Sequence, residues 1–161
     1  MEATDKPGTQ DLSIKDQWFF VGIPIFHSRV FCFVGSRKKM MESAYAGIAN
    51  FGLEDGADCS RYVEEYFFKK GTDTQPIGEF FCREGTSYIR IDRMYVGALE
   101  DMLVLNHECL HVANAILTWI RLNEEANIEG LCYTHEFIFG EIMKQMMASK
   151  GVTPTSRPPF S

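Results

Sequence analysis

The chain has 161 residues, of which 45% are hydrophobic and 24% charged, and its formal net charge at pH 7 is −6. This composition is typical of one globular domain with a buried core, and it excludes a disordered or fibrous chain. No stretch approaches the roughly 18 uninterrupted apolar residues of a membrane span, and an acidic chain of this kind is not expected to bind nucleic acid.

The two ends of the chain differ in composition from its middle. Residues 1–16 are polar and lack the apolar segment of a secretory signal, and residues 149–161 hold three prolines. We expect a flexible arm at 1–16, a single domain over 17–148 and a flexible tail at 149–161. Because no signal segment is visible, we also expect a cytoplasmic protein whose five cysteines are reduced thiols.

The first half of the domain is predicted to contain strands followed by helices. Residues 17–34 are rich in β-branched and aromatic types, which indicates one or two strands, although Pro24 weakens the first of them. Ser36 is a favourable N-cap for a helix over residues 37–50. A second, short helix is expected over residues 60–69.

The second half is predicted to contain a β-hairpin and two long helices. Residues 78–84 and 86–94 are strand-like runs joined near Gly85, and the polar–apolar alternation of the second run indicates a half-buried strand. The spacing of apolar residues predicts a helix over 99–122 and a last helix over 128–147. This order predicts an α+β fold, with the helices packed on one face of a small antiparallel or mixed sheet.

The predicted helix at 99–122 carries His107-Glu108-Cys109-Leu110-His111, an H-E-x-x-H motif. Histidines at positions i and i+4 project from one helix face and can bind one tetrahedral zinc ion. Glu108 lies beside them, in a position that suits a base acting on a water that the metal activates. The alternative is that both histidines are ordinary helix residues near the edge of the core.

A tetrahedral catalytic zinc site needs a third protein ligand. Asn114 and Leu117 stand where a metzincin would have glycine and histidine, so that class is excluded. A glutamate on the following helix is the other common solution. Glu129 lies in the first turn of that helix, where its charge suits the helix dipole and an antiparallel helix pair returns it toward the motif. The register between the helices leaves other candidates open, namely Glu124, Glu125, Glu136 and His135.

The stretches LNHECLHVANAIL and NIEGLCYTHEFI resemble the zinc site of gluzincin-type metallopeptidases. More closely, they resemble the small metallopeptidase-like proteins encoded by many bacteriophages and prophages. The resemblance covers about residues 28–145 and implies a minimal zincin-like fold, in which the H-E-x-x-H helix is followed by a glutamate-bearing helix. It implies that His107, His111 and Glu129 are the zinc ligands and that Glu108 is the catalytic base.

Further side chains near the motif are candidates with competing interpretations. Tyr133, one turn beyond Glu129, is either a donor to a developing oxyanion or a packed tyrosine. It follows Cys132, which departs from the family because an alanine often stands there, and which adds a soft donor nearby. His135 falls on an apolar stripe, which favours a core histidine over a metal ligand. Cys109 points away from the two histidines and is expected to be a small buried residue.

These features predict a zinc-dependent metallopeptidase-like hydrolase, encoded by a phage and acting in the host cytoplasm, that cleaves a peptide bond. The strand predicted at 86–94 is expected to be an exposed edge that pairs with an extended peptide or protein partner. Two alternatives stay open. One is a catalytically silent zincin-fold protein that binds a host or viral protein, with zinc as a structural staple. The other is a structural or accessory phage protein in which the motif is incidental.

Overall fold

The centre of the molecule is a four-stranded mixed sheet in the strand order β2-β3-β5-β4. The structure is a computed structural model that describes residues 10–122 and 128–154. The strands are β2 (Gln17–Ile23), β3 (Ser28–Val34), β4 (Gly78–Arg83) and β5 (Thr86–Ile91). The central strands β3 and β5 pair in parallel, whereas β2 and β4 pair antiparallel to their neighbours. The α+β class and the small mixed sheet are as expected.

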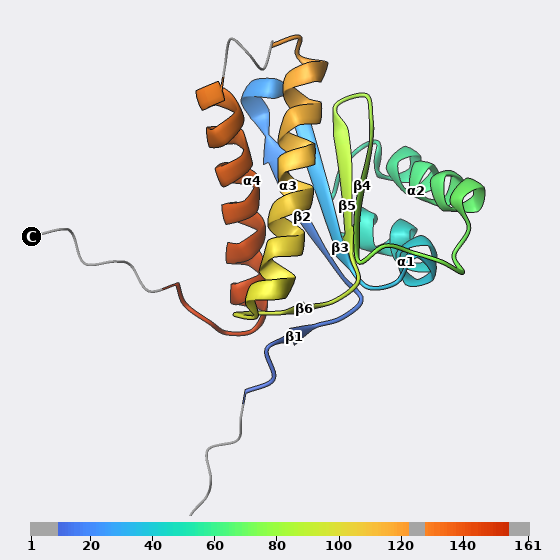
Figure 1. The fold of residues 1–161 in the computed structure, drawn as a ribbon. Helices are drawn as coiled ribbons and strands as arrows, with labels where there is room; N and C mark the ends of the chain where they lie inside the picture. The colour runs from blue at the N-terminus through green and yellow to red at the C-terminus, as the bar shows by residue number, and fades with distance from the viewer. Residues whose placement is uncertain (1–9, 123–127, 155–161) are drawn as a thin grey trace, which may run out of the picture.

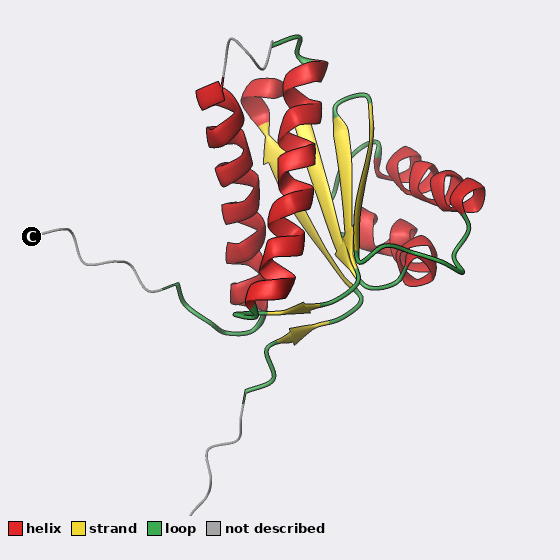
Figure 2. Cartoon of the chain, in the orientation of Figure 1, coloured by secondary structure: helices red, strands yellow, loops and turns green. Residues whose placement is uncertain are grey.

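Helices cover both faces of this sheet (Figures 1 and 2). Helices α1 (Arg37–Ala49) and α2 (Gly56–Lys70) pack on one face, and α3 (Leu99–Trp119) and α4 (Ile128–Ser149) pack on the other. The prediction that the helices lie on one face is therefore wrong.

The reason for two covered faces lies in the central strand β3, whose alternating side chains are all apolar between residues 30 and 34. Phe31 and Phe33 belong to an aromatic-rich core beneath α1 and α2. Val30, Cys32 and Val34 belong to a second core beneath α3 and α4. A strand that is apolar on both sides needs a layer of helices on each side.

The β4–β5 hairpin closes through Glu84 and Gly85, which have positive φ angles of 50° and 78°, as in a type I′ turn. The hairpin and its turn are as predicted, but the positions of its two strands in the sheet are not. Strand β5 lies inside the sheet between β3 and β4, so the prediction that strand 86–94 forms an exposed edge is wrong. The edge strand beside α3 is β4.

Short strands extend the fold beyond the predicted domain boundary. Strand β1 (Ser13–Ile14) pairs antiparallel with β6 (Met94–Tyr95), and the side chain of Ile14 is buried in the core under α3 and α4. The arm predicted to be flexible up to residue 16 therefore contributes to the core from Leu12 onward. A 3-10 helix, η1 (Pro24–Phe26), joins β2 to β3. Pro24 therefore begins this helix, and β2 ends just before it at Ile23.

The other predicted boundaries differ from the structure by a few residues. Ser36 caps α1 as expected, because its hydroxyl accepts a hydrogen bond from the Lys39 amide. Helix α2 begins at Gly56 rather than at residue 60. Glu124 and Glu125 lie outside the described residues. Within residues 10–122 and 128–154, none of the helices has the length and apolar composition of a membrane-spanning segment.

A buried ion cluster joins α1 to the β4–β5 hairpin. Glu79 of β4 accepts hydrogen bonds of 2.8 Å from Nε of Arg37 and from Nε of Arg90. Arg90 is fully buried, and its remaining donors reach the carbonyl oxygens of Gly35 and Pro76. Because each buried charge has partners, the cluster can be accommodated inside the fold. It fixes the edge strand β4 from the side opposite to α3.

Candidate metal centre

Helix α3 lies along strand β4, and two glycines of the β4–β5 hairpin, Gly78 and Gly85, allow the helix to approach it closely. A Cβ atom at Gly78 would lie 2.7 Å from Cγ1 of Val104 and 2.9 Å from Oε1 of Glu108. At the other end of the hairpin, a Cβ atom at Gly85 would lie 2.9 Å from Nε1 of Trp119. The H-E-x-x-H segment is thereby held against the edge strand of the sheet.

The two histidines of the motif meet on the exposed side of α3. The Nε2 atoms of His107 and His111 are 3.0 Å apart, and their rings are nearly perpendicular. Two zinc–nitrogen bonds of about 2.0–2.1 Å can span this separation. One neutral imidazole can equally donate a hydrogen bond to the other at this distance. The 3.0 Å separation is therefore compatible both with two ligands of one metal ion and with a hydrogen-bonded pair, and the metal-binding role stays a prediction.

Glu108 occupies a different environment from the histidines on either side of it in the motif. Its side chain turns toward β4 and is buried, with Oε1 close to Gly78. Burial raises the pKa of the Glu108 carboxyl, and the nearby imidazoles of His107 and His111 oppose this effect. A buried carboxyl beside two possible metal ligands is placed to accept and return a proton.

The ring of Phe80 forms the wall of the site on the strand side. Phe80 lies on β4 and stacks on the imidazole of His111, with ring centroids 5.2 Å apart and an angle of 3° between the planes. Because Gly78 and Phe80 are two residues apart on one strand, both face α3. One strand face therefore contacts both Glu108 and His111.

Glu129 does not complete the site as it stands in the structure. Among residues 10–122 and 128–154, no group of three or more His, Cys, Asp or Glu side chains could hold a metal ion. Glu129 lies in the first turn of α4 with an exposed side chain. The structure thus brings together His107, His111 and Glu108 but does not group Glu129 with them. Glu136, the reserve candidate, is also exposed on α4.

The other predicted residues of α4 lie away from the imidazole pair. Tyr133 lines an apolar pocket of about 380 Å³ together with Ile25 of η1 and Phe137, and neither motif histidine lines this pocket. A catalytic role for Tyr133 stays a prediction that this placement does not favour. His135 is part-buried, and its Nε2 lies 3.1 Å from the carbonyl oxygen of Asn106 on α3. It therefore links the two helices, in line with the predicted structural role.

The cysteines take structural or exposed positions. All five lie in the described part of the chain and form no disulfide. Cys109 is fully buried, as predicted. Cys132 is exposed on α4. Burial raises the pKa of the Cys109 thiol, which keeps this thiol protonated near neutral pH.

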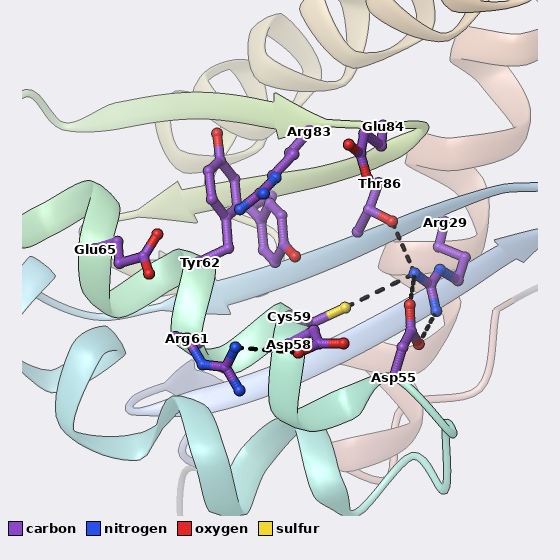
Figure 3. A pocket seen from close by; sticks show the side chains of 11 residues that line it. Arg29, Asp55, Asp58, Cys59, Arg61, Tyr62, Glu65, Arg83, Glu84 and Thr86 are labelled. Atoms are coloured by element: carbon purple, nitrogen blue, oxygen red, sulfur yellow. Dashed lines mark hydrogen bonds and ion pairs between the residues drawn. The ribbon is translucent and has the colours of Figure 1, made fainter.

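A second pocket, of about 450 Å³, opens between α2 and the β4–β5 hairpin (Figure 3). Four of the charged residues that line it form two ion pairs. Arg29 makes two hydrogen bonds to the Asp55 carboxylate and one to the Thr86 hydroxyl, and Arg61 lies 3.4 Å from Asp58. This pocket lies on the α1–α2 side of the sheet, away from the histidine pair. The bonding of Arg29 to Asp55 and Thr86 is typical of a structural ion pair that joins α2 to the sheet.

Comparisons with known proteins add no relative from which a role could be transferred. No family model, no curated protein sequence and no solved structure matches the chain.

Sequence reasoning missed three residues on or beside the motif helix. Gly78 and Phe80 lie almost thirty residues before the motif, and their role depends on which strand forms the sheet edge. Asn114 lies one turn beyond His111, and its Oδ1 is buried without a hydrogen-bond partner in the described part of the chain. Its spacing from His111 on the same helix was the only local signal, because i and i+3 residues are neighbours on a helix surface.

Proposed function

We propose that the chain is a zinc-dependent metallopeptidase-like hydrolase with a minimal zincin-like fold. His107, His111 and Glu129 would hold the metal, and Glu108 would act as the base. The proposal rests on the 3.0 Å approach of the two Nε2 atoms beside the buried Glu108 carboxyl. When bound, zinc supplies a Lewis acid that polarises a peptide carbonyl and increases the acidity of water.

Glu108 is the proton carrier in this proposal. Its carboxylate accepts a proton from the attacking water and then passes it to the leaving amine. Glu108 faces Gly78 of β4, the strand along which the proposed substrate would lie.

The exposed edge of β4 supports an extended peptide as the substrate. In a two-residue hairpin the pair beside the turn, here Arg83 and Thr86, is hydrogen-bonded, and bonding then alternates along the ladder. The N–H and C=O groups of Gly78 and Phe80 consequently point away from β5. At residue 82 the free edge ends, because the Tyr62 hydroxyl donates to the Cys82 carbonyl. A peptide can add to this edge as a further strand.

The place of Glu129 on α4 is compatible with the role of third ligand. Helices α3 and α4 run antiparallel side by side (Figure 1), and His135 lies opposite Asn106. Glu129 is six residues before His135, about 9 Å along the helix axis. This spacing places it near the level of Val112, the neighbour of His111. Zinc binding would require the exposed Glu129 side chain to move toward the imidazole pair, with which the structure does not group it.

A second candidate is a zinc-stapled binding protein without catalysis. It is favoured by the incomplete ligand group in the described residues and by the exposure of both histidines. In this version the edge of β4 binds a segment of a host or viral protein that is not cleaved. The proposed phage origin and cytoplasmic site of action are shared by both candidates.

Glu108→Gln separates the two candidates. We expect the variant to retain zinc and to hydrolyse an unfolded protein such as denatured casein at least about 100-fold more slowly, which is the lower range for loss of a general base. Glu100→Gln, an exposed change in the first turn of the same helix, is the matched control and should leave both properties unchanged. Zinc binding without hydrolysis by the wild type would favour the binding protein, and equal rates for wild type and variant would refute the role of Glu108.

A further inference from the structure

We propose that Phe80 is a positioning residue that orients the imidazole of His111 for metal binding. This inference rests on the proposed function. The observation is the parallel stacking of the two rings, at 5.2 Å between centroids and 3° between planes. A metal-binding imidazole must present one nitrogen lone pair in a fixed direction, and stacking on a second ring favours one orientation about χ2.

His111 has few other constraints on its ring. Metal-binding histidines are usually oriented by a hydrogen bond from the second ring nitrogen to a carboxylate or carbonyl. Within the described part of the chain, the hydrogen bonding of the His111 ring is limited to Nε2 of His107, and the side chain is exposed. The face of Phe80 therefore takes the orienting role that a second hydrogen bond would otherwise fill.

Phe80 is itself held firmly, because its neighbours on β4 are anchored on the opposite face of the sheet. Glu79 is fixed by the buried guanidinium groups of Arg37 and Arg90. Phe81 stacks on Tyr66 with ring centroids 3.9 Å apart and on Tyr88 at 5.0 Å. Side chains on alternate positions of a strand point to opposite faces. The anchors thus fix the backbone of residue 80 while its ring remains against α3.

The same residue connects the metal centre to the proposed peptide site. The N–H and C=O groups of Phe80 point to the free edge of β4, whereas its ring touches His111. A peptide that pairs with this edge is therefore placed beside the imidazole that binds the metal. Phe80 acts through His111 and the backbone, and it does not itself contact the reacting atoms.

The test uses the full chain and zinc alone, with Phe80→Leu, Phe80→Tyr and the control Phe137→Leu on α4. We expect Phe80→Leu to weaken zinc affinity by about 10–100-fold, the usual range for loss of a group that supports a metal ligand. Phe80→Tyr keeps the stacked ring and should restore the affinity. Phe137→Leu should leave it unchanged, since Phe137 lines the pocket at η1.

A second readout needs no metal. In the zinc-free wild type, stacking over the Phe80 ring should shift the His111 ring protons upfield in the NMR spectrum, and Phe80→Tyr should preserve this shift. Zinc affinity that is equal in folded Phe80→Leu and wild type overturns the role of Phe80 but not the proposed function. If Phe80→Leu does not fold, unshifted His111 protons in the wild type overturn the inference. A wild type that binds no zinc overturns both.

Discussion

The polar side chains of the motif have different environments because a helix turns by about 100° per residue. His107 and His111 share the exposed side of α3, whereas Glu108 is rotated toward β4 and is buried. This part of the site could be predicted from spacing alone. The position of a third ligand could not, because it depends on the register between α3 and α4, and local periodicity does not determine that register.

Replacement of Glu129 tests the third ligand. If Glu129 turns toward His111 when zinc binds, Glu129→Ala should weaken zinc affinity by at least about 10–100-fold, because one of three protein ligands is lost. Isothermal titration with zinc measures the change. Glu136→Ala is the control, since that residue shares the exposed side of α4 about two turns further along. A loss for Glu136→Ala and none for Glu129→Ala would reverse the assignment.

Gly78 is predicted to be intolerant of even a methyl group. A Cβ atom there would lie within 2.9 Å of both Val104 and Glu108, so Gly78→Ala should lower the free energy of unfolding by about 1–3 kcal/mol through overpacking. Urea denaturation measures this loss. Gly22→Ala on β2 is the matched control, because its nearest neighbour, the Phe20 ring, would lie at 3.8 Å. Equal stabilities for the two variants would show that α3 does not approach β4 so closely.

At the scale of elements, hydrogen exchange can test the free edge of β4. The ladder predicts that the amides of Glu79 and Phe81, which bond to β5, exchange slowly, whereas those of Gly78 and Phe80 exchange much faster. An added peptide that pairs with this edge should slow the fast set selectively. Uniform protection of all four amides in the free protein would mean that the edge is already covered.

The alternation of polar and apolar residues in β5 predicted a strand here, but it could not predict which strands lie beside it in the sheet. Tyr88, Arg90 and Asp92 alternate with two isoleucines, which is typical of a half-buried edge strand. In the structure β5 is central. Tyr88 packs in the aromatic core, and Arg90 is buried because Glu79 pairs with it. Arg90 is buried through a partner on another strand, and β5 pairs in parallel with β3 although two helices and β4 lie between them in the chain. Local periodicity cannot reveal such long-range features.

At the scale of the whole molecule, the Arg37–Glu79–Arg90 cluster connects the two halves of the chain. Glu79→Gln would leave the buried Arg37 without a countercharge and would leave Arg90 with the more exposed Asp92 carboxylate, 3.5 Å away. We expect it to reduce the free energy of unfolding by about 3–5 kcal/mol. Urea denaturation measures the difference. Glu141→Gln, which breaks the more exposed pair with Lys144, should cost less than about 1 kcal/mol. Similar small losses for both would indicate that the cluster is not required for stability.

The two helical layers divide the molecule into a structural side and a candidate functional side. The α1–α2 side holds the aromatic core and the pocket of paired charges, and the α3–α4 side holds the imidazole pair beside a free strand edge. This separation means that metal binding should depend on α3 and not on α2. Replacement of Asp55 in the paired pocket is expected to leave zinc affinity unchanged.

The most direct measurement is the zinc content of the full chain, purified without a histidine tag and analysed beside the His107→Ala/His111→Ala double variant. We predict about one zinc per chain for the wild type and none for the folded double variant, because both imidazoles of the 3.0 Å pair are lost. Circular dichroism of the two proteins controls for folding. A wild type without zinc, or a double variant that retains it in full, would contradict the assignment of a metal centre to α3.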